Sequence, residues 1–267
     1  MQYLIKDLSR MTGIKGFTIR KWQERYRFFQ PTLASNGYWY YSNDDYVVLS
    51  RIVRLLSEGM RISKIASIGR DKILQSRNDK DYSEDERTFV NWMSSQNFAA
   101  LKSYLDERRS REKFTVFINL TVKNLVVLCG RAWEDGLLTT ADEHSFSRWI
   151  FGYLRGVVSW MENSAKPVWL VAVFPGDRHE IGALMYYALL RYKKIAAKFV
   201  GILPIEHVIR ELNRSNQYKA VSFSMTLAQT PAKIDKLRGR IQSRTNIKKV
   251  MIGGRGYSLT KHGALKY

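Results

Sequence analysis

The sequence predicts a multidomain protein with three parts: a helix-turn-helix segment with a β wing, a four-helix bundle, and an α/β domain built on a parallel sheet. Three observations predict this fold class. Two helical patterns flank Gly13 and precede an aromatic hairpin, a segment nearly free of Pro and Gly has helical spacing, and apolar runs then alternate with helical patterns. We expect the parts to be residues 1–75, 80–164 and 166–267.

The positive charge gathers at the two ends of the chain. Net charge is +20 over 267 residues. Residues 1–70 hold 12 Lys/Arg against 5 Asp/Glu (+7), residues 71–179 hold 15 against 15 (zero), and residues 180–267 hold 17 against 4 (+13). A basic first segment favours contact with DNA phosphates. The larger excess at the other end is compatible with nucleic acid, anionic lipid or solubility alone.

Several classes of protein are excluded by the composition. No uninterrupted apolar run approaches the ~18 residues of a membrane span, so we expect no membrane partner. The start, MQYLIKDLSRMTG, lacks the apolar core of a signal peptide. The single cysteine, Cys129, excludes an internal disulfide and a cysteine-cluster zinc site. The expected location is the cytoplasm.

The first part has the pattern of a DNA reader. The run YLIKDLSRMTG, a turn at Gly13 and the run GFTIRKWQERY predict helix, turn and helix. The second helix is anchored by Ile19 and Trp22 and presents polar and basic residues that suit the major groove. The alternative is a basic surface that is merely solvated. The residues predicted to meet DNA from this helix are Lys15, Thr18, Arg20, Lys21 and Arg25.

A hairpin follows in PTLASNGYWYYS, where Asn36-Gly37 is a strong turn signal. Its aromatic residues predict a wing along the phosphate backbone, while the alternation sends some rings into the core. The residues predicted to meet DNA here are Tyr38, Trp39 and Tyr40.

The order of these residues resembles the winged helix-turn-helix of the MerR superfamily, over residues 3–68. The resemblance implies binding to a double-stranded DNA operator. Gln23 stands where the family usually has Glu, and Trp39 where the wing usually has Arg. We therefore expect backbone affinity through the wing to be reduced, or to come from stacking and other basic groups.

The middle part predicts four amphipathic helices with short linkers, near residues 84–94, 97–109, 112–135 and 140–162. From 167 onward, PVWLVAVFP, AKFVGILP, KAVSFSMT and KKVMIGG predict strands, and the segments between them predict helices. A fifth strand just fits in the final GALKY, but a fifth helix does not.

The loop FPGDRHEIG follows the first of these strands. Parallel sheets bind ligands at the carboxyl ends of their strands. His179 is either an ordinary loop residue or a metal ligand whose second nitrogen is held by Asp177, with Gly182 admitting a bulky group. The ends of two further strands carry small and hydroxyl residues, which either leave a slot or are ordinary strand ends. They are Ser224, Thr226, Gly253 and Gly254.

Asp-x-His-x-x-Gly, Ser-x-Thr and Gly-Gly, in this order, resemble the Rossmann-like cobalamin-binding domain over residues 167–262. The resemblance implies that His179 replaces the lower axial base on cobalt and that the displaced nucleotide tail enters the slot. We expect the domain to be short at its C-terminal end and to lack the last helix of the usual fold. We expect this to loosen the tail slot.

The middle part contains Trp133 followed ten residues later by Glu143 and His144. On the residues alone these are a core aromatic and a helix face. However, Trp-x9-Glu-His resembles the helical cap of the cobalamin-dependent photoreceptor repressors of the MerR superfamily. The resemblance implies that the three side chains cover the upper face of cobalamin. Glu134 stands where light-responsive members carry a His that traps the photolysed cobalt.

The combined expectation is a cobalamin-binding transcriptional regulator, a repressor without catalysis of its own. The resemblance implies adenosylcobalamin or methylcobalamin as cofactor and a homo-oligomer, dimer or tetramer, on the operator. Cofactor state, with light as a further candidate input, would set oligomer state and thereby DNA affinity. Two rivals remain: a regulator whose α/β domain binds no cobalamin and serves oligomerisation, and a corrinoid carrier for methyl transfer. A corrinoid carrier would not need the helix-turn-helix pattern of residues 3–68.

Overall fold

The computed structural model describes residues 2–57, 59–75, 82–161, 165–214 and 216–262. By internal contacts the chain divides into two compact units: unit 1 is Met1–Leu101 with Asn124–Phe146, and unit 2 is Lys102–Lys123 with Ser147–Tyr267. The predicted bundle segment thus contributes to both units. The division into three domains stays a prediction.

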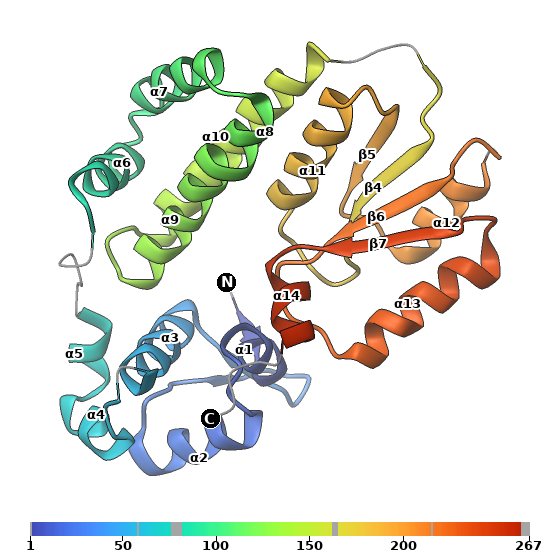
Figure 1. The fold of residues 1–267 in the computed structure, drawn as a ribbon. Helices are drawn as coiled ribbons and strands as arrows, with labels where there is room; N and C mark the ends of the chain where they lie inside the picture. Colours follow the sequence, from blue (N-terminus) through green and yellow to red (C-terminus); the bar gives the residue numbers. More distant parts are fainter. Residues whose placement is uncertain (1, 58, 76–81, 162–164, 215, 263–267) are drawn as a thin grey trace. The chain divides into compact units, whose positions relative to one another are not determined.

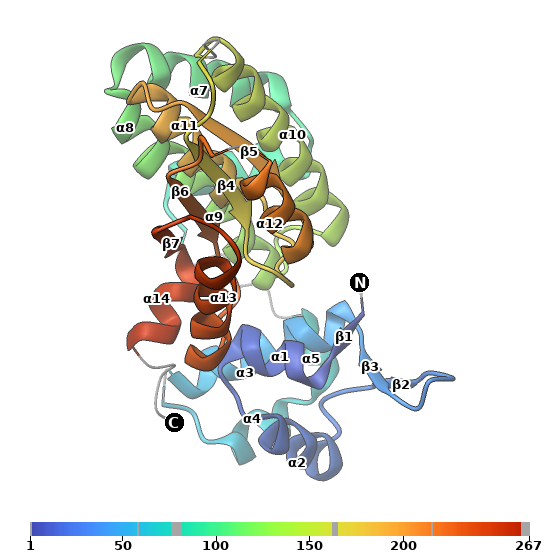
Figure 2. The same cartoon turned by 90° about the vertical axis from the view of Figure 1, so that its right-hand side faces the viewer.

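Unit 1 begins with the predicted helix-turn-helix and wing. Gly13 has a φ of 77°, the left-handed conformation that ends the first helix and that glycine adopts without cost. Three short antiparallel strands have the order β1-β3-β2. Figure 2 shows the β2–β3 hairpin projecting beyond α1 and α2. The elements are β1 (Tyr3–Leu4), α1 (Ile5–Thr12), α2 (Gly16–Tyr26), β2 (Thr32–Leu33) and β3 (Trp39–Tyr41).

Three more helices complete this part, and an apolar cluster joins them to α1 and α2. Leu8, Ile19, Ile52 and Ile65 are fully buried in this cluster, each from a different helix. Burying one such side chain contributes ~1.5–3 kcal/mol, so the cluster is what holds the short helices together. The added helices are α3 (Asn43–Ser57), α4 (Ile62–Ile68) and α5 (Arg70–Gln75).

The four predicted helices of the middle segment are confirmed. Ser83 starts the first with a capping box, in which Ser83 Oγ accepts from the Glu86 amide at 3.2 Å. The third contains a π-helical turn that the sequence did not predict. How the four pack as a bundle stays a prediction. The elements are α6 (Glu84–Ser94), α7 (Phe98–Arg111), α8 (Phe114–Val116), η1 (Phe117–Val122), α9 (Lys123–Glu134) and α10 (Thr140–Ser159).

Among the described residues, one helical stretch, Phe114–Glu134, is long and apolar enough to span a membrane by length and composition. The search of the sequence for uninterrupted apolar runs did not identify this stretch. Of its most apolar 18-residue window, 44% is buried inside the protein, and Leu125, Leu128 and Ala132 are at most 5% exposed. Part of its apolar surface thus packs in the protein's own core, whereas Leu120 and Val127 are 56% and 54% exposed.

The α/β part of unit 2 has the predicted alternation of strands and helices. Its four parallel strands have the order β5-β4-β6-β7. Figure 1 shows α11 on one side of this sheet and α12 and α13 on the other. The elements are β4 (Trp169–Val173), α11 (Ile181–Tyr192), β5 (Ala197–Gly201), α12 (Ile205–Asn213), β6 (Ala220–Ser224), α13 (Pro231–Arg244), β7 (Lys249–Gly253) and α14 (Arg255–His262).

The short helix α14 follows β7 directly and was not predicted. The possible fifth strand in GALKY lies outside the described residues. The core between the sheet and α12 and α13 is made by alternate strand residues, such as Leu170 and Val221, packed against Val208 and Ile241. This packing leaves the carboxyl ends of β4, β6 and β7 to the connecting loops.

Candidate DNA-binding and cofactor sites

Helix α2 presents the predicted basic face. Ile19 is fully buried and Trp22 packs partly into the same core, whereas Arg20, Lys21 and Arg25 are exposed. Lys15 is exposed at the N-cap of the helix, and Thr18 is only half-exposed. Within the described part of the chain, Arg20, Lys21 and Arg25 form no ion pair with a carboxylate, which leaves their charges available for phosphate. Contact with DNA stays a prediction.

Phe17 belongs to the same face and was missed from the sequence. Its side chain is 68% exposed, and the Lys21 ammonium lies 4.5 Å from the ring centroid. An exposed ring within a basic face suits the methyl group of thymine in the major groove. The signal in the sequence was its helical spacing from Arg20 and Lys21.

The wing separates its four aromatic residues. Gly37, with a φ of 77°, forms the tip of the hairpin. Tyr38 and Trp39 are 61% and 51% exposed, Tyr40 is half-buried, and Tyr41 belongs to the core. Tyr38 and Trp39 are therefore exposed on the wing, and their contact with a phosphate backbone stays a prediction.

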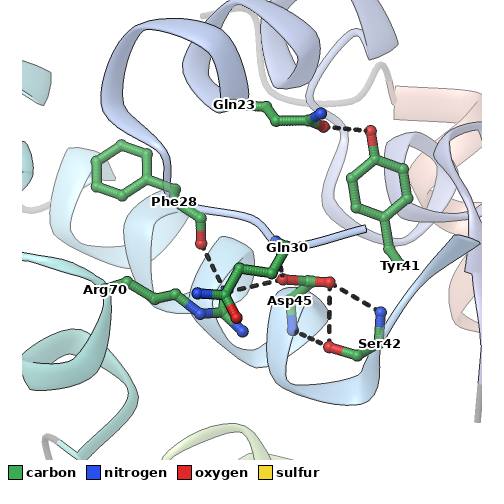
Figure 3. Close-up of polar contacts among 7 residues, drawn as sticks. All are labelled: Gln23, Phe28, Gln30, Tyr41, Ser42, Asp45 and Arg70. Atoms are coloured by element: carbon green, nitrogen blue, oxygen red, sulfur yellow. Dashed lines mark hydrogen bonds and ion pairs between the residues drawn. The ribbon is translucent and has the colours of Figure 1, made fainter. Parts of the chain in front are cut away.

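A buried polar network fixes the wing to the helices (Figure 3). The Asp45 carboxylate is fully buried; it accepts from the Gln30 amide at 2.9 Å, from the Ser42 amide at 2.9 Å and from Arg70 Nη1 at 2.8 Å. Arg70 Nη1 also donates to the Phe28 carbonyl at 2.6 Å. Asp45 thus ties the segments before and after the wing to the start of α5.

The recognition helix itself is tied to the wing. The Tyr41 hydroxyl donates to Gln23 Oε1 at 2.7 Å (Figure 3). Burial raises the pKa of Tyr41, although the nearby Arg20 charge acts in the opposite direction. From the sequence alone, Gln23 was recognised only as a departure from the family pattern. In the structure its amide is the partner that keeps α2 and β3 in a fixed orientation.

The loop after β4 holds His179 as a ligand would be held. Asp177 Oδ1 lies 2.6 Å from His179 Nδ1, and Asp177 Oδ2 accepts from the amides of Thr226 at 2.6 Å and Leu227 at 3.0 Å. The Asp177 side chain is fully buried, whereas that of His179 is 54% exposed. A neutral imidazole that donates Nδ1–H to a carboxylate carries its lone pair on Nε2. Among the described residues, that nitrogen has no protein partner.

The electrostatics keep Asp177 ionised behind the ring. Burial alone would raise the pKa of Asp177, but hydrogen bonds from His179 and from the Leu227 and Thr226 amides outweigh it. The pKa therefore lies below its ordinary value. A buried carboxylate increases the basicity of the imidazole that it holds, which strengthens a metal–nitrogen bond.

The predicted slot residues gather around this loop. A Cβ on Gly182 would lie 2.8 Å from Ser224 Oγ, so α11 approaches the end of β6 closely, and a larger residue would require the Ser224 side chain to turn away. Gly254, with a φ of 108°, would place a Cβ 2.5 Å from the Met225 carbonyl, whereas a Cβ on Gly253 would meet open space. The residues present fit a cobalamin: a half-exposed imidazole backed by a carboxylate, beside strand ends without bulky side chains.

The three residues of the predicted cap lie in unit 1. Trp133 stacks on Tyr46, with ring centroids 5.2 Å apart and planes inclined by 23°, and its Nε1 donates to Thr140 Oγ1 at 3.3 Å. Glu143 Oε2 lies 2.6 Å from His144 Nδ1, one turn further along α10. The structure thus brings Trp133 to the helix that carries Glu143 and His144. Their contact with a cofactor stays a prediction.

The end of α9 is bound to α3 by more than this stack. The Tyr46 hydroxyl donates to Glu134 Oε1 at 2.9 Å, and Arg51 Nε donates to the Glu134 carbonyl at 2.9 Å. Asp135 pairs with Arg54 and accepts from the Tyr82 hydroxyl at 2.8 Å. The sequence identified Glu134 only as a substitute for a cobalt ligand. Here its carboxylate is engaged by the DNA-binding part.

Comparison with known proteins finds relatives of this chain in sequence and in fold. Residues 3–71 match the family described as MerR HTH family regulatory protein. The HTH-type transcriptional repressor CarH of Myxococcus xanthus is 26% identical over 213 residues, covering 74% of this chain and 70% of that protein. The repressor CarA of the same organism is 27% identical over 204 residues, covering 75% and 68%.

The monomethylamine corrinoid protein of Methanosarcina barkeri has a similar structure, with a TM-score of 0.51 and 16% identity over 67% of this chain and 89% of that chain. At this identity the likeness concerns the fold alone. The family match at residues 3–71 confirms the resemblance seen in the sequence at residues 3–68. Residues 3–71 are thus a MerR-type helix-turn-helix domain, and over about three quarters of its length the chain is similar to the CarH and CarA repressors.

Proposed function

We propose that the protein is a transcriptional repressor whose affinity for its operator is set by a bound cobalamin. One observation carries the cofactor assignment: a buried, ionised Asp177 holds Nδ1 of the half-exposed His179 ring at the carboxyl end of β4. The similarity to CarH and CarA supports repression as the output. Catalysis is not part of the proposal, because both relatives are named as regulators.

The DNA-binding part acts through α2 and the wing. Arg20, Lys21 and Arg25 supply charge. Tyr38 and Trp39 supply stacking surface, with Trp39 at the position where Arg is usual in the family. Repressors of this class bind as symmetric assemblies, so we expect a homodimer or homotetramer on a palindromic or direct-repeat operator.

The cofactor part would hold cobalamin through His179, and Gly182, Ser224 and Gly253 would make room for its nucleotide tail. Adenosylcobalamin or methylcobalamin would supply a cobalt–carbon bond that light can break. Trp133, Glu143 and His144 are assigned to the upper face by the sequence resemblance. The roles of the chain's own residues are to hold the imidazole, orient it and keep Asp177 ionised.

We infer that the signal reaches α3 through the end of α9. The Tyr46 stack uses one face of the Trp133 ring, and a cofactor that draws the ring toward itself would break this stack. Release of Trp133 would also weaken the Tyr46–Glu134 hydrogen bond next to it. A ligand shifts an equilibrium only by differential contacts with its two states, and this exchange supplies them.

The test is a dark titration of the purified protein with adenosylcobalamin, followed by absorbance and by calorimetry. His179→Ala should lower the affinity and remove the spectral signature of imidazole coordination. Asp177→Asn should keep the ligand but weaken its bond to cobalt. His207→Ala, at an exposed position of α12, is the matched control. If the wild-type protein binds no cobalamin, the α/β domain serves another purpose, such as oligomerisation. If His179→Ala binds as the wild type does, the ligand assignment is wrong.

A further inference from the structure

A row of lysines lies at the amino-terminal ends of the strands of the α/β sheet, opposite the carboxyl ends that carry the predicted cofactor loop. The strands start in register: Trp169 of β4 pairs with Ala197 of β5 and with Ala220 of β6, and Ala220 pairs with Lys249 of β7. Residues that precede these strands therefore share one edge, far along the strands from the predicted cofactor loop. We name this set the lysine edge: Lys166, Lys193, Lys194, Lys219, Lys248 and Lys249.

Backbone and ring contacts support this placement. The Lys219 amide donates to the Val168 carbonyl at 2.8 Å, which places Lys219 beside the start of β4. The Lys249 ammonium lies 5.0 Å from the centroid of the Trp169 ring. Lys194 has a φ of 61° in the tight turn between α11 and β5. The edge is thus a contiguous surface across the starts of four neighbouring strands.

The charges of the lysine edge are not neutralised within the described residues. All six lysines are exposed, and Lys166, Lys193, Lys194, Lys219 and Lys248 form no ion pair there. Glu211, an acidic residue near this edge, is already engaged by Lys198 at 2.7 Å and by the Tyr218 hydroxyl at 2.8 Å. Five of the 17 Lys/Arg in residues 180–267 therefore lie on one surface, and Lys166 adds a sixth charge.

We propose that the lysine edge binds the phosphate backbone of the DNA that flanks the operator, without reading its sequence. The inference rests on the proposed function. Lysine ammoniums are point charges that meet phosphates without a fixed geometry, so they contribute affinity rather than base recognition. Three strand spacings of ~4.8 Å span about 14 Å, the axial length of about four phosphates on one DNA strand.

Because the lysine edge is covalently linked to the DNA-binding part, even weak contacts between its lysines and phosphates contribute to the affinity for DNA. When α2 and the wing hold the operator, unit 2 is tethered to the same DNA and meets it at an effective concentration in the millimolar range. The predicted cofactor site, at the carboxyl ends of the strands, does not use these lysines. The lysine edge can therefore hold DNA while the cofactor site is filled.

The test uses the full-length protein and two duplexes selected for binding: a core operator and the same operator with long flanks. The edge variant is Lys194→Gln, Lys219→Gln and Lys248→Gln together, one lysine from the start of each of three strands. The control removes three exposed lysines elsewhere in unit 2: Lys123→Gln, Lys233→Gln and Lys236→Gln. The measurement is the slope of log K against log salt concentration.

On the flanked duplex the edge variant should lose about 0.9 of slope for each phosphate contact removed, and thus about 2.7 in all, while the control keeps the wild-type slope. On the core duplex all three proteins should agree. An edge variant with the wild-type slope on flanked DNA would overturn the proposal. So would loss of binding to phosphatidylserine vesicles, or a changed oligomeric state, without a change in slope. If wild type binds neither duplex, the proposed function itself fails.

Discussion

The indole ring of Trp133 stacks on the phenol ring of Tyr46, 5.2 Å between centroids, and thereby joins the end of α9 to α3. The two residues are 87 positions apart, and the Tyr46 hydroxyl also binds the Glu134 carboxylate. The residue that resembles a cofactor cap is thus at the same time part of the packing of the DNA-binding part.

Truncation of Tyr46 should therefore destabilise unit 1. Tyr46 is 5% exposed, and Tyr46→Ala removes both the stack and the hydrogen bond, for an expected loss of about 3–5 kcal/mol in the free energy of unfolding. Tyr46→Phe keeps the ring and should cost about 1 kcal/mol. Denaturant unfolding followed by fluorescence measures both. Tyr38→Ala, at an exposed position of the wing, should stay within about 0.5 kcal/mol of wild type; equal losses for Tyr38→Ala and Tyr46→Ala would contradict the packing role.

The buried Asp45 network predicts that removing one charge of the Asp45–Arg70 pair costs more stability than removing both. Asp45→Ala leaves the Arg70 guanidinium without its buried partner and should cost about 3–5 kcal/mol of stability. The double variant Asp45→Ala with Arg70→Met removes both charges and should recover part of that loss. Thermal unfolding of the full-length protein measures the difference, and a double variant less stable than Asp45→Ala alone would argue against a charge pair.

Acid should weaken the α/β part through Asp177. Its folded-state pKa is depressed, so its contribution to stability is present above its ordinary pKa of about 3.9 and is lost as pH falls through the lower folded value. Asp177→Asn should therefore be less stable than wild type at neutral pH, and the gap should close below pH of about 3.9. Urea unfolding at a series of pH values measures this gap. A gap independent of pH would show that the carboxylate contributes by shape and not by charge.

The exposed face of α2 predicts distinct roles for two neighbouring residues. Arg20→Ala should weaken operator binding by about 1–3 kcal/mol if Arg20 reads a base. Phe17→Ala should remove a preference for thymine, because burying one methyl group is worth about fourfold in affinity.

Duplexes in which single thymines are replaced by deoxyuridine test this directly. The wild type should lose affinity at one position, and the Phe17→Ala variant should bind both duplexes equally. Additive losses from the Phe17 and thymine changes would show that the two groups do not touch. Lys64→Ala, exposed on α4, is the control.

The response to light should be weak or readily reversed, because Glu134 replaces the imidazole that would trap photolysed cobalt. A carboxylate is a poorer ligand for that ion than a histidine nitrogen. Size-exclusion chromatography of the adenosylcobalamin complex in the dark, in green light and returned to the dark measures oligomeric state. Glu134→His should make the light-induced state persist.

Tyr46→Phe is the matched control for that variant, since it breaks the same hydrogen bond to Glu134 without adding an imidazole. A stable light-induced state in the wild type would show that Glu134 does not limit the response. Equal persistence in Glu134→His and Tyr46→Phe would assign the effect to the lost hydrogen bond.

The sequence by itself determined the elements whose signals are local. The period of apolar residues marked the strands and helices from 167 onward, and Asn36-Gly37 marked the wing turn, because backbone preferences and one-sided burial act over a few neighbouring residues. The spacing of Asp177 and His179 likewise predicted the contact between the carboxylate and the imidazole, since both residues lie on one loop after one strand. Helix α14 was not predicted, because its apolar pattern does not differ from that of a loop. The π-helical turn at Phe117–Val122 was not predicted, because its apolar pattern does not differ from that of an α-helix.

Only the tertiary structure decided which residues meet across long separations. Asp177 binds the amides of Thr226 and Leu227, about 50 positions away, and Glu134 meets Tyr46, 88 positions away. The lysine edge exists only because parallel pairing in register brings the starts of four strands together. Such contacts depend on how whole elements pack, and no window of neighbouring residues contains that information, because the free energy that selects them comes from burial shared by distant segments.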